Sequence, residues 1–178
     1  MGHAATDETG AATVEFVVVF PIFLLVFLSC FEASLLLTRQ LMLERAIDVV
    51  MRDVRLSTGV VYPHWQLRRD VCERATILPD CDRNLVLEIT QVDRTTYDMP
   101  SVLSPCVDRA TSVQAYSTDT LITQGNQNDL MLVRACFVVD PVFPGAGLGL
   151  ELVRGQDDGT RMVAASAFVQ EPAAAPGS

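Results

Sequence analysis

The sequence contains no lysine, because all thirteen of its basic residues are arginines. A P-loop uses a lysine to bind nucleotide phosphates, and Schiff-base and Ser/Lys catalysis use one as nucleophile or base. The absence of lysine excludes these three kinds of site. The formal net charge of −9 argues against a nucleic-acid-binding protein, because neutralising phosphates requires a basic face.

Motifs for catalysis, cofactors and metals are also missing. His64 has Asp70 and several serines near it, but no nucleophile motif such as GxSxG accompanies it. The run Gly145–Gly149 is not a GxGxxG fingerprint, because Leu150 stands where a glycine is needed. No CxxC or Cys/His spacing indicates a metal site. We therefore expect no enzyme and no cofactor.

A long apolar run lies near the start of the chain. Residues 16–31 read FVVVFPIFLLVFLSCF, and a second apolar stretch follows at Ala33–Leu37. Counted from Ala11, the run reaches the ~20 residues with which a helix spans a bilayer. Residues 1–10 contain no arginine, the run is long for a signal peptide, and no A-x-A-like site follows it. We predict a transmembrane helix over residues 11–37 rather than an ordinary secretory signal.

Two carboxylates and a proline interrupt this apolar segment. Glu15 inside a bilayer costs at least about 2.5–3.5 kcal/mol unless it is paired, although at the start of a helix the dipole also favours a carboxylate. Glu32 lies ~25 Å further along a straight helix, near the far interface, where an interfacial or snorkelling carboxylate is favoured over a subunit contact. Pro21 should bend or loosen the helix.

Beyond Thr38 the pattern becomes amphipathic. One apolar stripe recurs at helical spacing, with charged residues opposite it, so residues 38–58 are predicted to continue the same helix. We expect one helix from about Thr13 to Ser57, with Gly59 as its stop. The stripe should pack against the chain's own domain or against neighbouring subunits. It consists of Leu43, Ile47, Val50 and Val54.

Residues 59–170 are predicted to form a small α+β domain with an antiparallel sheet and a short helix, and residues 171–178 a flexible tail. The helix is expected over Trp65–Leu78, and Thr95–Pro105 and Pro141–Gly149 are expected to be loops. The predicted strands are Leu85–Val92, the weaker Thr111–Tyr116, Leu130–Val139 and Arg161–Gln170. The fold class is thus α+β, a long N-terminal helix followed by a small sheet domain.

Four of the five cysteines follow the apolar run, and Cys30 lies inside it, where we expect a small buried hydrophobic residue. An even number in a non-cytoplasmic domain indicates two disulfides, and of three pairings we favour Cys72–Cys81 with Cys106–Cys136. Four reduced, buried thiols are the alternative. The first arginines lie beyond the span, so the positive-inside rule alone would place the domain in the cytoplasm; the cysteines favour the opposite side.

The front of the chain resembles the TadE/TadG-like minor pilins, or pseudopilins, of Tad (tight adherence) type IV pilus systems. The resemblance rests on Gly10-Ala11-Ala12-Thr13-Val14-Glu15-Phe16, the apolar stretch with Pro21, Phe31-Glu32, and Thr38-Arg39-Gln40. It implies that residues 1–10 are a leader, cleaved between Gly10 and Ala11 by a prepilin peptidase. Glu15 would then be the fifth mature residue and would pair with a neighbouring subunit's N-terminal ammonium. The implied assembly residues are Glu15, Phe16, Pro21 and Glu32.

The resemblance implies a minor pilin that takes part in assembling or priming an adhesion pilus. Its partners would be other minor and major pilins, the prepilin peptidase, the inner-membrane assembly platform and membrane lipid. It would cross the inner membrane once, with its C-terminal domain in the periplasm or on the pilus. Leaders of this family commonly contain basic residues, whereas this one contains Asp7 and Glu8. The alternative is an anchored periplasmic binding or sensor module that never enters a filament.

Overall fold

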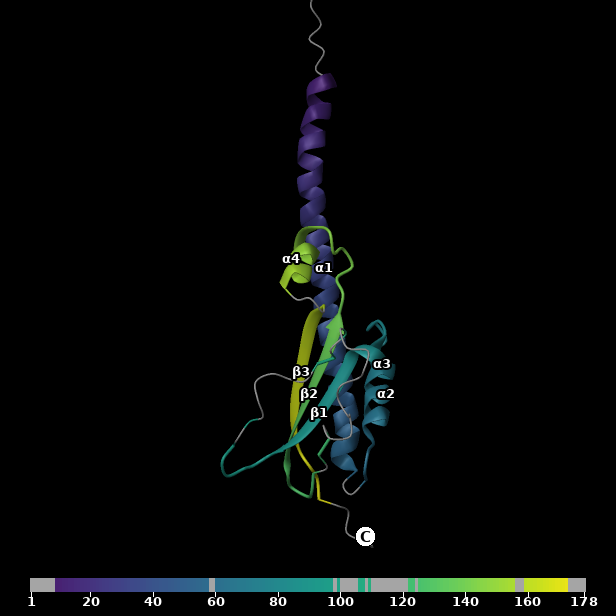
Figure 1. Ribbon diagram of the computed structural model, residues 1–178, viewed down its shortest axis with the longest axis vertical. Helices are drawn as coiled ribbons and strands as arrows, with labels where there is room; N and C mark the ends of the chain where they lie inside the picture. Colours follow the sequence, from purple (N-terminus) through teal and green to yellow (C-terminus); the bar gives the residue numbers. More distant parts are fainter. Residues whose placement is uncertain are drawn as a thin grey trace, which may run out of the picture.

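The computed structural model describes residues 9–57, 60–97, 99, 106–107, 109, 122–123, 125–155 and 159–172. A long N-terminal helix carries a small three-stranded sheet and three short helices on its C-terminal half (Figure 1). The other half of the helix extends away from the domain. The predicted α+β class, with a long helix and a small antiparallel sheet, is confirmed. The weaker predicted strand Thr111–Tyr116 and the helix stop Gly59 lie outside the described residues.

Helix α1 spans Thr9–Leu56 without interruption and includes Pro21. At 1.5 Å per residue it is roughly 70 Å long, more than twice the thickness of a bilayer's hydrocarbon core. Three hydroxyl groups beyond the proline donate to the carbonyl four residues earlier, at 2.7–2.8 Å, and so need no partner outside the helix. These are Ser29, Ser34 and Thr38.

The sheet has the order β1-β2-β3, and both pairs of strands are antiparallel. Strand β1 spans Leu85–Val92, β2 spans Leu130–Val139 and β3 spans Thr160–Val169. The central strand is buried from Val133 to Val139, which accounts for its near-continuous apolar sequence. The three predicted strands are therefore confirmed to within one residue at each end.

The apolar stripe of α1 packs inside its own domain. Leu43, Ile47 and Val50 are buried, and Val54 is partly buried against the same core. One face of the sheet supplies the other side, with Leu85, Leu87, Ile89, Val133, Ala135, Phe137, Met162 and Ala164. Of the two partners left open by the sequence, the chain's own domain is the one that covers the stripe.

Two short helices lie between α1 and β1. Helix α2 spans His64–Arg74, shorter than the predicted Trp65–Leu78, and α3 spans Cys81–Asn84. His64 is buried, with Nε2 3.2 Å from the carbonyl oxygen of Leu87, so this histidine joins α2 to β1. On the other face of the sheet, Arg134 of β2 donates from Nε to Glu88 of β1 at 2.9 Å, and both side chains are largely buried.

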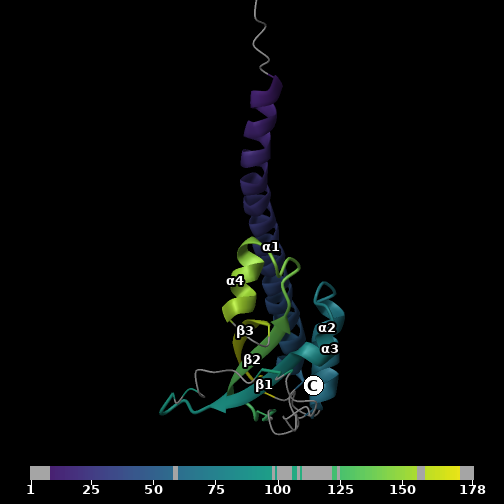
Figure 2. The ribbon, with the colours of Figure 1, turned by 45° about the horizontal axis from the view of Figure 1, so that its top comes forward.

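The prediction that Pro141–Gly149 is a plain loop is wrong for its last residues. Helix α4 begins at Gly147 and runs to Gly155. Figure 2 shows α4 beside α1, between the sheet and the N-terminal half of α1 that extends away from the domain, which we call the bare half (residues 13–27). Glycine is a poor helix former, which favours a loop here, but the packing against α1 outweighs that propensity.

Candidate functional site

The bare half of α1 presents an apolar surface with one carboxylate. The described side chains from Thr13 to Phe27 are exposed, and this helix is long and apolar enough to cross a membrane. Glu15 is exposed among them, beside Phe16 and Val18. Within the described part of the chain, no hydrogen bond or ion pair reaches the Glu15 carboxylate. In a bilayer this group needs a partner from outside the described chain.

The residues of the expected processing site lie on the same helix. Gly10 and Ala11 belong to the first turns of α1, which begins at Thr9. The helix therefore starts before the expected cleavage point, two residues earlier than the mature N-terminus that the sequence predicts. Phe16 and Pro21 lie one to three turns further on and are exposed, and Phe16 stacks on Phe20 with ring centroids 5.0 Å apart.

Glu32 occupies a different environment from Glu15. Glu32 is 1% exposed, although the side chains from Thr13 to Phe27 on the same helix are exposed. The backbone amide of Val142 donates to both carboxylate oxygens at 3.0 Å, and the amide of Phe143 donates to Oε2 at 3.0 Å. Glu32 is therefore buried and bonded within its own chain instead of facing solvent. It fixes the segment after β2 to α1.

Contacts around Glu32 extend this junction toward the bare half of the helix. The hydroxyl of Ser29 accepts a hydrogen bond from the amide of Leu148 at 3.2 Å, and Phe31 contacts Phe143 edge to face with centroids 6.0 Å apart. Gly147 has a φ of +54°, and a Cβ there would clash with the Ser29 hydroxyl. The close approach of α4 to α1 thus requires glycine at position 147.

A segment of 43 residues near the N-terminus matches a known family. Residues 10–52 match the family model described as TadE-like protein. The chain carries a TadE-like domain. The matched range contains Gly10, Ala11, Glu15 and Glu32, and it corresponds to almost all of α1. A comparison with curated proteins and one with solved structures give no significant match.

The match over residues 10–52 supports an association with Tad pili. Among the residues that the structure describes, one helix is long and apolar enough to cross a membrane, which fits a protein anchored by one span. The rest of the chain, from residue 53 onward, lies outside the family match. The small sheet domain is therefore known here through its structure alone.

The outer side of the TadE-like helix remains uncovered beside the domain. Leu41 is 64% exposed and Val49 is also exposed, and charged side chains of both signs flank them. These charged residues are Glu44, Arg45, Asp48 and Arg52. This face is a continuous strip of α1, and a parallel helix can pack on it through apolar contacts and ion pairs.

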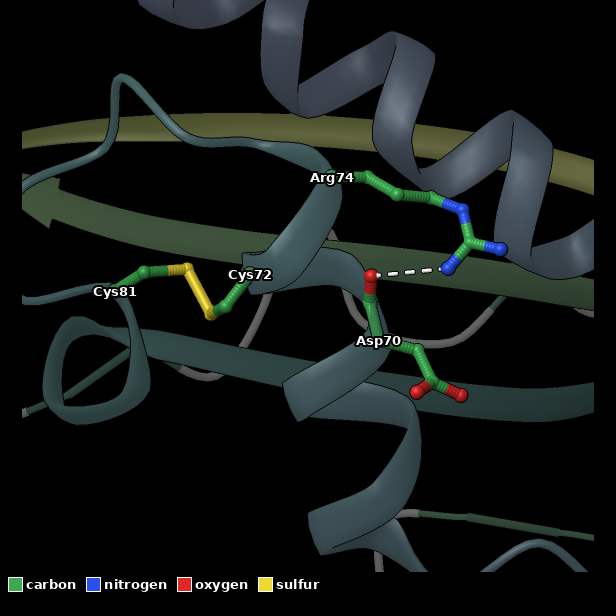
Figure 3. The surroundings of a disulfide bond; sticks show 4 residues. All are labelled: Asp70, Cys72, Arg74 and Cys81. Carbon is green, nitrogen blue, oxygen red and sulfur yellow. Dashed lines mark hydrogen bonds between the residues drawn. A yellow bond between two sulfur atoms is a disulfide. The ribbon is translucent and has the colours of Figure 1, made fainter.

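Two disulfides brace the domain beside the TadE-like helix. Cys72 of α2 is bonded to Cys81, the first residue of α3, and Cys106 is bonded to Cys136 in the central strand. Figure 3 shows the first bond next to Arg74, which donates to the Asp70 carbonyl at 3.3 Å and points toward α1. There the Arg74 guanidinium lies 3.5 Å from the Asp53 carboxylate. The first bond joins α2 to α3, and the second joins Cys106, which lies outside the helices and strands, to β2. Cys30 is exposed, so the expectation that it is buried is wrong.

Sequence reasoning did not find the junction around Glu32. Ser29, Val142, Phe143 and Gly147 were not identified as residues that bind the helix to the domain. Their partners are more than 100 residues away in sequence, so no local period or motif marks them. The available signal was the pair Gly147 and Gly149 within an apolar segment, because glycines in such a segment indicate close backbone approach.

Proposed function

We propose that this protein is a minor pilin of a Tad-type pilus, inserted in the inner membrane through α1 and later packed into a pilus or a priming complex. One observation carries the proposal: the Glu15 carboxylate has no partner among the described residues and lies on the exposed, otherwise apolar stretch Thr13–Phe27 of α1. The residue stands five positions into a chain that would begin at Ala11 after cleavage. The ammonium group at Ala11 of a neighbouring subunit supplies the positive charge that pairs with the Glu15 carboxylate.

The energetics favour a contact between subunits. A carboxylate in the bilayer costs at least about 2.5–3.5 kcal/mol, and a terminal ammonium near it carries a similar penalty. A pair formed between two subunits lowers both costs. The free energy of association is therefore most favourable when the neighbouring subunit is in the correct register. Phe16 and Pro21, exposed on the same half of the helix, would line the contact between packed helices.

Glu32 takes another part in this proposal. Its carboxylate is bonded inside its own subunit, so its role in assembly is to hold the domain at a fixed height on α1. The outer strip with Leu41 and Val49 would then lie at a defined position for neighbouring pilins. We place the domain on the periplasmic side, because its two disulfides persist in an oxidising compartment.

The experiment that tests the assembly role replaces Glu15 by alanine in cells that build the pilus. The variant keeps an insertable helix, so it should reach the membrane at the normal level while pilus assembly is lost. Val18→Ala is the matched control, since Val18 is exposed on the same half of the helix and carries no charge. Normal piliation with Glu15→Ala would contradict the proposal and would favour an anchored binding or sensor module instead.

A further inference from the structure

The depth of each residue in the bilayer follows from its position on α1. With a hydrocarbon thickness of about 30 Å and a rise of 1.5 Å per residue, about 20 residues span the core. A span that begins near Thr13 therefore ends near Glu32. Leu25 to Phe31 lie within roughly the last 10 Å of hydrocarbon on the side of the domain.

The segment after β2 packs against these same residues. The Leu148 amide donates to Ser29, and Phe143 contacts Phe31. Gly147 lies so close to α1 that a Cβ there would contact Ser29 and the Leu25 carbonyl. The beginning of α4 is thus level with the end of the membrane span rather than with the sheet. Both views of the ribbon place α4 beside α1 between the sheet and the bare half of the helix (Figures 1 and 2).

The chemistry of this segment suits a lipid environment. Residues 141–153 read PVFPGAGLGLELV and contain one ionisable side chain, Glu151. Val142 is 46% exposed and Val153 44% exposed, so apolar groups face outward as well as toward α1. Phe31, on the adjoining surface of α1, is 45% exposed.

Several backbone amides of the segment are paired within the chain, as an environment with little water requires. Irregular backbone at membrane depth is tolerated only where its polar groups are paired within the protein. Pro141 and Pro144 carry no amide hydrogen. Four amides of the segment have partners in the chain: Val142 and Phe143 donate to Glu32, Ala146 donates to the Phe143 carbonyl, and Leu148 donates to Ser29.

We propose that residues 141–153, which we name the collar, insert into the leaflet on the domain side and form a second contact with lipid beside the single span. Lipid at the boundary between headgroups and acyl chains covers the exposed apolar face of the collar, because the collar is continuous with the membrane-spanning surface of α1. Amphipathic helices bind this boundary with their apolar side buried about 5–10 Å deep. The proposal rests on α1 spanning the membrane, as in the function proposed above.

Tryptophan fluorescence in vesicles tests the depth of the collar. The full chain, with Trp65 replaced by phenylalanine, is reconstituted into phosphatidylcholine vesicles with and without lipid brominated near the top of the acyl chains. Single tryptophans are placed at exposed positions of the collar, as Val142→Trp and Val153→Trp. Val18→Trp reports the span itself, and Val169→Trp at the far end of β3 reports the aqueous side.

Brominated lipid should remove about half of the emission from Val142→Trp, because a residue at the acyl boundary meets the quencher directly. Val153→Trp should be quenched to a smaller extent, and aqueous iodide should quench only Val169→Trp strongly. If iodide quenches both collar variants while brominated lipid quenches Val18→Trp, the span is correct and the collar proposal is wrong. If neither reagent quenches the collar variants, protein covers the segment and the proposal is also wrong. If Val18→Trp escapes brominated lipid, α1 itself does not span the bilayer.

Discussion

The carboxylate of Glu32 accepts hydrogen bonds from the backbone amide of Val142, which lies 110 residues further along the chain. This bond joins the TadE-like helix to the segment that follows the central strand. It also explains how a carboxylate is accommodated close to the end of the proposed membrane span. A buried carboxylate bonded to backbone amides has its charge stabilised by oriented N–H groups instead of water.

Glu32→Ala should release the collar from α1. The substitution leaves the amides of Val142 and Phe143 without an acceptor, which costs about 1–3 kcal/mol per buried group. Amide hydrogen exchange at Val142 and Phe143 should accelerate, while exchange in β2 stays slow. Glu44→Ala, an exposed carboxylate on the same helix, is the control and should leave both amides protected. Unchanged protection with Glu32→Ala would show that the bond does not hold the collar.

Gly147→Ala should destabilise the packing of α4 on α1 for two reasons that can be separated. The new Cβ clashes with the Ser29 hydroxyl, and alanine is strained at a φ of +54°. The double variant Ser29→Ala with Gly147→Ala removes the clash, but it keeps the strain and also removes the acceptor of the Leu148 amide. It should therefore recover only part of the lost stability, leaving a residual cost of about 2 kcal/mol. Thermal unfolding of the detergent-solubilised protein measures the series.

Gly145→Ala is the matched control for that series, because a Cβ at position 145 meets nothing within 4 Å. It should be neutral. Equal losses for Gly145→Ala and Gly147→Ala would indicate that glycine is needed for loop flexibility rather than for close approach to Ser29.

The two disulfides should contribute different amounts to the free energy of unfolding. The Cys72–Cys81 bond closes a separation of 9 residues, and Cys106–Cys136 closes one of 30. Chain entropy then predicts losses of about 3 kcal/mol for Cys72→Ser and about 4 kcal/mol for Cys106→Ser. Denaturant unfolding measures both. Alkylation of the native protein from membranes should modify Cys72 and Cys106 only after reduction, and free thiols at both positions would contradict the bonds and the periplasmic placement.

Two leucines of α1, Leu41 and Leu43, allow an effect on assembly to be distinguished from an effect on folding. Leu41 is 64% exposed on the outer strip, and Leu43 is fully buried in the core. Leu43→Ala should cost about 2–5 kcal/mol of stability. Leu41→Asp should leave the thermal midpoint nearly unchanged and reduce pilus assembly, because it places a charge on the strip proposed to contact other pilins. Full piliation with Leu41→Asp would show that this face is not in a subunit contact.

Local patterns were enough to predict α1 and the three strands that the structure contains. The apolar run and the stripe from Leu43 to Val54 have helical period, and Leu130–Val139 has the apolar, β-branched composition of a buried strand. The TadE-like family was visible from the residues around Glu15 for the same reason, because they are contiguous.

The collar was missed because its structure depends on distant residues. Gly147 and Gly149 disfavour a helix when read locally, yet α4 forms because it packs on α1 at Ser29. Glu32 likewise has no local partner, so the sequence left it as an interfacial group. Contacts between residues over 100 positions apart carry no signal in a single sequence.

The N-terminal sequence of the protein extracted from membranes tests the central claim most directly. A minor pilin whose Glu15 pairs with a neighbouring subunit's ammonium must be cleaved after Gly10, so the mature chain should begin at Ala11. In cells without the prepilin peptidase it should begin at Met1. A chain that retains Met1 through Gly10 in the presence of the peptidase would contradict the account, because Glu15 would then have no ammonium at the required position.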